Sequence, residues 1–131
     1  MSFISRAEVF LVDQGELAND SNRDMMIDTV AYLLENARGF SNRKSTDTIV
    51  NHLRSLGYDN LKREDWQIGV MGKLRDHGIF IGSKKGGHGG IFLINSREDA
   101  RLVLQSYGTR VEKEARRLQI LREQMGELDW L

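Results

Sequence analysis

Glycines and basic side chains gather in one stretch of the chain, residues 82–90, where the sequence reads GSKKGGHGG. Glycine-rich loops that carry a lysine cradle phosphates in nucleotide-binding proteins, because their backbone amides point at the ligand. This stretch lacks the Gly-Lys-Ser/Thr ending of such a loop, and an apolar, strand-like run follows it in place of a helix. We therefore expect no nucleotide site, although Lys84 and Lys85 supply charge and the glycines permit a close approach of backbone to a partner.

The residue types that commonly bind metals or carry out catalysis do not form a known metal-binding or catalytic motif in this sequence. His52, His77 and His88 fall in three different predicted elements, and the chain has no cysteine, so a transition-metal site is not expected. No acidic residue has a lysine two positions later, the spacing of a magnesium-dependent nuclease core. Counting does not exclude a serine–histidine–acid triad, but no nucleophile elbow appears. The sequence predicts a chain that is not an enzyme, with no catalytic residues, cofactor, metal or small-molecule substrate.

The distribution of charge points to a polyanionic partner, although the formal net charge is zero. Residues 1–37 carry 2 basic and 7 acidic side chains, which makes this part acidic. Residues 38–90 carry 10 basic and 5 acidic side chains, and residues 91–131 carry 7 of each. A basic middle segment is what a nucleic-acid partner requires.

The length and composition indicate one intracellular domain. The 131 residues fall within the roughly 100–150 that are typical of single domains. The absence of cysteine fits a reducing compartment. No apolar run approaches the roughly 20 residues of a membrane span, and the N-terminus does not resemble a signal peptide. The sequence therefore predicts a cytoplasmic protein without membrane contact.

Apolar spacing predicts three helices in the first two thirds of the chain. Met26, Val30, Leu33 and Leu34 recur at helical spacing after Asn22. Ser45 stands at the N-cap of a second helix that ends at Gly57, and a third helix runs from about Leu61 to His77. The run Val9–Val12 fits a strand or a buried helical turn, and the residues alone do not decide between them.

A β-hairpin and a helical C-terminal segment follow. The apolar runs 79–81 and 91–94 flank the glycine-rich turn and predict two strands. Ser96, with Asp99 three residues on, begins the last segment, whose apolar residues recur at helical spacing. This segment is either one long helix with a weak point at Gly108 or two helices that meet there, and we favour the long helix. The sequence thus predicts a mainly α fold with a small β-hairpin.

Three helices followed by a hairpin make the chain similar to the winged helix-turn-helix superfamily. The resemblance rests on 45–56, the turn 57–60, the helix 61–77 and the wing 78–94. The whole chain also resembles small phage and restriction-associated proteins in which a wing is followed directly by a long helix. Residues 23–95 match the order of elements of this superfamily, so we expect a winged-helix domain there, after an acidic N-terminal segment at 1–22 and before a C-terminal helix at 96–131. Gly69, Gly72, Glu64 and Asp65 depart from the usual recognition helix, since glycine weakens it and acids repel phosphate.

The resemblance implies that the third helix enters the major groove of duplex DNA and that the wing contacts the backbone. The DNA-binding residues it implies are Arg43, Lys44, Ser45, Lys62, Arg63, Gln67, Lys73, Lys84, Lys85 and His88. Gln67 is able to read adenine with two hydrogen bonds, but the helical wheel also allows it to flank the buried stripe.

These observations predict a double-stranded DNA-binding protein, a regulator or accessory factor of a phage or mobile element. The apolar stripe of the C-terminal segment, with Trp130 and Leu131 at its end, predicts a homodimer. The alternative is a winged-helix module that binds proteins, or the DNA-reading subunit of a larger enzyme assembly. DNA binding predicts that the ten basic residues of 38–90 form one continuous face, whereas the protein-interaction module is favoured if they scatter around the domain.

Overall fold

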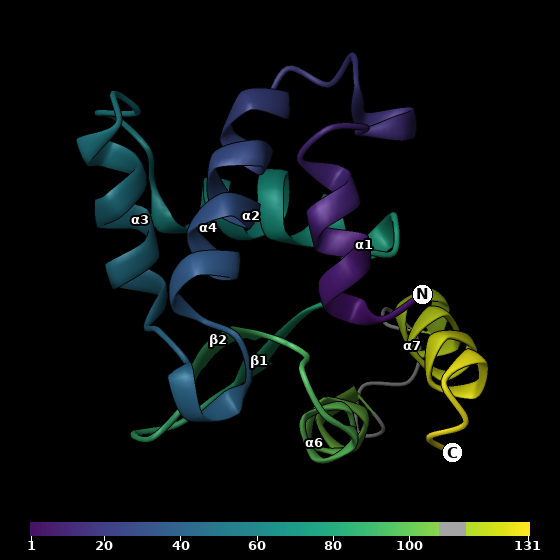
Figure 1. Ribbon diagram of the computed structural model, residues 1–131. Coiled ribbons are helices and arrows are strands. Elements are labelled where there is room, and N and C mark those ends of the chain that lie inside the picture. The colour runs from purple at the N-terminus through teal and green to yellow at the C-terminus, as the bar shows by residue number, and fades with distance from the viewer. Residues whose placement is uncertain (108–114) are drawn as a thin grey trace.

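The computed structural model describes residues 1–107 and 115–131. The fold is mainly helical with one small antiparallel sheet, as predicted (Figure 1). The α-helices are α1 (Phe3–Phe10), α2 (Arg23–Asn36), α3 (Thr46–Ser55), α4 (Arg63–Trp66), α5 (Lys73–Asp76), α6 (Arg97–Tyr107) and α7 (Ala115–Glu127). The strands are β1 (Ile81–Lys84) and β2 (Gly90–Leu93). Short 3-10 turns lie at Gly15–Leu17 and Phe40–Asn42, and a π-helical segment, Gln67–Gly72, joins α4 to α5.

Serine side chains begin two of the helices, as the sequence predicted. Ser45 Oγ accepts a hydrogen bond from the Thr48 amide at 3.1 Å, and Ser96 Oγ accepts one from the Asp99 amide at 3.1 Å. The buried Asp99 carboxylate also accepts from the Asn95 amide at 2.9 Å and the Phe40 amide at 3.1 Å. Asp99 therefore fixes the start of α6 to the turn that precedes α3.

The N-terminal residues form a helix that packs on the rest of the molecule. Of the two possibilities for Val9–Val12, the structure has the helical turn, since α1 ends at Phe10, but Phe10 alone of these four residues is buried. Ala7, Phe10 and Leu17 are buried in the same hydrophobic cluster as α2. The acidic segment is thus attached to the core by its apolar face.

The predicted third helix is one continuous helical stretch, Arg63–Asp76, with the π-helical segment in its middle. Both glycines of that segment lie close to other parts of the chain. A Cβ on Gly69 would lie 2.9 Å from Asn22 Nδ2, and a Cβ on Gly72 would lie 3.0 Å from Arg117 Nη2. These glycines therefore make room for the neighbouring side chains, in addition to weakening the helix.

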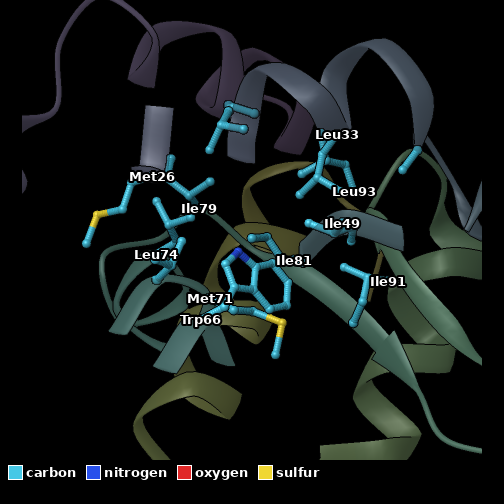
Figure 2. Packing of buried hydrophobic residues seen from close by; sticks show 14 of the residues in the cluster. Met26, Leu33, Ile49, Trp66, Met71, Leu74, Ile79, Ile81, Ile91 and Leu93 are labelled. Atoms are coloured by element: carbon cyan, nitrogen blue, oxygen red, sulfur yellow. The ribbon is translucent and has the colours of Figure 1, made fainter. Parts of the chain in front are cut away.

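Trp66 lies at the centre of the larger hydrophobic cluster (Figure 2). Its side chain is fully buried, and its indole Nε1–H donates to Thr29 Oγ1 of α2 at 3.2 Å. Around it lie Leu74 of α5, Ile49 of α3 and Ile81 of β1 (Figure 2). The helix 63–76 is therefore held by α2, α3 and the hairpin together.

Besides β1, the segment that precedes α3 also hydrogen-bonds to β2, along its outer edge. β1 and β2 pair in register from Ile81 opposite Leu93 to Lys84 opposite Gly90. Lys44 and Ile91 exchange two backbone hydrogen bonds of 2.9 and 2.7 Å, and the Leu93 amide donates to Ala37 O at 2.8 Å. The segment before α3 is therefore fixed to the hairpin, which places the N-terminus of α3 beside the strands.

The C-terminal segment forms two helices, so the prediction of one long helix is wrong. Arg97 Nη2, at the start of α6, donates to the backbone carbonyl of Asp129 at 3.0 Å. A continuous helix from residue 97 to residue 129 would separate these ends by roughly 48 Å. The predicted weak point, Gly108, lies outside the described residues. Among the described residues, no helix has the length and apolarity that crossing a bilayer requires.

The apolar stripe of α7 packs inside the same chain. Leu121 and Met125 are buried with Phe80, Phe92 and Ile94 in a second hydrophobic cluster. The Trp130 ring lies 5.9 Å from the Phe3 ring, centroid to centroid, which places α7 beside the start of α1 (Figure 1). The predicted homodimer stays a prediction, but the stripe on which it was based is already covered.

Candidate nucleic-acid interface

A groove of about 500 Å³ lies between the start of α3, the helix 63–76 and the hairpin. Four basic residues line it, and none of the described lining residues is acidic; the basic ones are Arg63, Arg75, Lys84 and Lys85. Ser45, Thr46, Gln67 and Ser83 add polar groups to the lining. A cleft lined by one sign of charge attracts ligands of the opposite sign, which here means an anion.

The start of α3 forms one wall of the groove. Ser45 Oγ is already occupied by its bond to the Thr48 amide. Asp47, in the first turn, lies 3.8 Å from Arg63 Nη1, but both side chains are more than half exposed. An exposed ion pair of this length contributes little to stability. Arg63 is therefore able to exchange Asp47 for a phosphate at small cost.

The helix 63–76 forms the second wall. Arg63, Gln67, Met71 and Arg75 follow one another at intervals of four and all line the groove. Gln67 is half-buried and Met71 is buried. Gln67 therefore both flanks the buried stripe and lines the groove, the two positions that the sequence left open. Sequence reasoning missed Arg75, although it continues the series of steps of four that begins at Arg63 and Gln67, a signal that would have found it. Arg75 Nε donates to Ile81 O at 2.6 Å, which fixes it against β1.

Arg43 attaches the tip of the hairpin to the segment before α3. Its Nε donates to His88 O at 2.6 Å, and its Nη1 donates to Phe40 O at 3.1 Å. Two cations lie close to the Phe40 ring, with Arg43 Cζ at 4.2 Å and Lys84 Nζ at 5.3 Å from its centroid. Arg43 therefore acts on the groove by holding its rim in place.

Glycine is required where the loop of the hairpin closes. The Gly89 amide donates to Gly86 O at 3.0 Å. A Cβ on Gly89 would overlap the backbone carbonyl of Lys84, so no other residue fits this conformation. The exposed side chains of Lys85 and His88 flank this turn.

Two further predicted residues lie beside the groove without lining it. Lys44 precedes Ser45 and pairs with Ile91 through its backbone, and its side chain is half-buried. Lys62 is exposed and immediately precedes α4. The ammonium groups of these two lysines are therefore near enough to contact a long polyanion that extends along the groove and beyond it.

Lys73 is separate from the other predicted residues. Its Nζ binds Asp20 Oδ2 at 2.8 Å, in the acidic N-terminal segment. This hydrogen bond, with one from the Asn22 amide, holds the pKa of Asp20 below its ordinary value of 3.8. The basic residues of 38–90 are thus partly gathered at the groove and partly placed elsewhere.

The second half of the helix 63–76 is covered from outside. Arg117 of α7 donates to Asp76 Oδ1 at 2.7 Å and to Gly72 O at 3.1 Å. Asn22 donates to Gly69 O at 3.2 Å on the other flank. Only the first half, residues 62–68, therefore has a freely exposed outer face.

Within residues 1–107 and 115–131, no group of three or more His, Asp and Glu side chains is placed to hold a metal ion. Comparisons of the chain with protein-family models, with curated proteins and with solved structures found no match.

Proposed function

We propose that the chain binds double-stranded DNA through the groove between α3, the helix 63–76 and the hairpin, as a regulator or accessory factor. The observation that carries this proposal is the lining of the groove, which includes Arg63, Arg75, Lys84 and Lys85 and no described acidic residue. Because the chain has no net charge, this local excess of basic residues must supply the attraction to phosphates.

The order and placement of the elements support a winged-helix arrangement. α3 is followed by a short turn, by the helix 63–76 and then by the hairpin. In helix-turn-helix proteins, the first residues of the second helix contact base edges in the major groove. Residues 62–68 are the half of this helix whose outer face is exposed, so they are the part able to enter a groove.

The hairpin is the element best suited to the phosphate backbone. Lys84 and Lys85 are exposed at its tip, and Gly86 and Gly87 beside them are exposed glycines that permit a close approach of backbone to a partner. Arg43 holds this tip against α3 through His88 O, so the lysines and the helix keep a fixed spacing. Phosphate contacts of this kind fix the orientation of a protein on DNA, while side chains of the helix read the bases.

A protein-interaction module is the second candidate, because the exposed half of the helix carries Glu64, Asp65 and Ile68 on its outer face. Acids oppose phosphates, and the exposed isoleucine supplies apolar surface for a partner protein to bury. A DNA-reading subunit of a larger assembly is a further form of this candidate. It requires that the groove binds the duplex while the exposed half of the helix contacts the partner protein.

Amide chemical shifts of the ¹⁵N-labelled chain, titrated with a random duplex at low salt, test the proposal. DNA binding predicts shifts at Ser45, Gln67, Gly86 and Gly89, which reverse when salt is added. The Lys73 amide, on the other flank, serves as the internal control and is expected to move little. Shifts confined to α6 and α7, or none at all, would contradict the proposal and favour the interaction module.

A further inference from the structure

Ile68 is the one large hydrophobic side chain exposed on the helical region 61–77, with 76% of its surface accessible. The other large apolar residues of this region, Leu61, Trp66, Val70, Met71 and Leu74, are buried. A single exposed hydrophobic residue is ordinary on most surfaces. This one lies on the half of the helix that α7 and Asn22 leave uncovered.

Ile68 lies on the solvent side of the helix. It is the second residue of the π-helical segment Gln67–Gly72, and such segments are frequent at functional sites. Gln67, its neighbour, lines the groove. Glu64, one turn earlier, is also exposed, so this side of the helix is in contact with solvent rather than with the core.

We infer that Ile68 contacts the 5-methyl group of thymine in the major groove, which makes it a specificity-determining residue for A·T pairs; the inference rests on the proposed function. The thymine methyl is the apolar group that the major-groove edges present, and apolar side chains recognise it. Isoleucine has no donor or acceptor, so opposite cytosine it would leave the N4 amino group without a partner. Gln67 beside it is suited to adenine, which agrees with the same preference.

The test compares two alternating duplexes, poly(dA-dT) and poly(dA-dU), which differ only in the 5-methyl group. We expect the chain to bind the thymine duplex roughly fourfold more tightly, the factor that burial of one methyl group gives at 25 °C. Ile68→Ala is expected to bind both duplexes equally, and Ile68→Val is expected to keep most of the difference.

Val12→Ala is the matched control, because Val12 is a β-branched side chain that is 85% exposed on the turn after α1. It is expected to keep the full preference for thymine. Equal binding of both duplexes by the unchanged chain would overturn the inference and leave the proposed function intact. A loss of affinity in Ile68→Ala that is the same for both duplexes would also overturn it. Absence of salt-sensitive binding to either duplex would overturn both.

Discussion

Arg43 Nε donates a hydrogen bond to the backbone carbonyl of His88 at 2.6 Å, across 45 positions of sequence. The same guanidinium stacks on Phe40, with Cζ 4.2 Å from the ring centroid. This side chain thus ties the tip of the hairpin to the segment before α3, in addition to the backbone hydrogen bonds between Lys44 and Ile91, and it helps to hold the rim of the groove.

Arg43→Lys keeps the charge but loses the planar donors that reach His88 and Phe40. We expect weaker binding to duplex DNA and faster amide hydrogen exchange at Gly87 and Gly89 than in the unchanged chain, because the loop is no longer held. Fluorescence anisotropy and hydrogen exchange measure the two effects. If Arg43→Lys binds DNA as well as the unchanged chain, the arginine contributes charge alone and the positioning argument fails.

Gly82→Ala tests the packing between the hairpin and α6. A Cβ at Gly82 would lie 2.7 Å from the Phe92 ring and 2.8 Å from Val103 Cγ2. Overpacking of this kind is expected to lower the free energy of unfolding by about 1–3 kcal/mol, measured by chemical denaturation. Gly87→Ala, where a Cβ would meet nothing within 4 Å, is the control and should change stability by less than about 0.5 kcal/mol. Equal effects of the two substitutions would contradict the observed packing.

Thr29→Val removes the acceptor of the Trp66 indole N–H while keeping the shape of the side chain. The buried donor then has no partner, and we expect a loss of about 1–3 kcal/mol in the free energy of unfolding. In a Trp66→Phe background the same substitution should cost much less, because the donor is gone. A double-mutant cycle by urea denaturation measures this coupling, and additive costs would show that the hydrogen bond contributes nothing.

The Asp20–Lys73 pair predicts a pH-dependent contribution to stability. The folded-state pKa of Asp20 is held below 3.8, so the pair stabilises the fold above the unfolded value and loses its effect as pH falls through the lowered one. Asp20→Asn should therefore melt at a lower temperature than the unchanged chain at pH 7. The two melting curves should converge as the pH falls through the lowered pKa of Asp20. A difference that persists in acid would mean that the substituted asparagine disturbs the structure by another route.

The elements were more predictable from sequence than their connections in space. Ser45 and Ser96 marked helix starts correctly, because an N-cap depends on residues within one turn. The long C-terminal helix was wrong, because only contacts such as Arg97 with Asp129, distant in sequence, decide whether the segment folds back. Periodicity shows that a face is apolar, but it does not show what covers that face.

The candidate site shows the same division. Arg63, Gln67, Lys84 and Lys85 were named from sequence, and they line one groove. Lys73 was named with them, but its partner Asp20 belongs to an N-terminal segment whose position no local pattern specified. The cover that Arg117 provides over Gly72 and Asp76 was equally invisible, since it depends on the path of α7.

Salt dependence of binding to a random duplex tests the central claim most directly, because the proposed groove acts through phosphates. The logarithm of affinity should fall linearly with the logarithm of salt concentration, with a slope of about −0.9 for each phosphate contacted. Changing Lys84 and Lys85 together to alanine should make that slope shallower by about 1.8, whereas Lys73→Ala should leave it nearly unchanged. An equal slope in the unchanged chain and the double variant, or no binding at low salt, would contradict DNA binding through this groove.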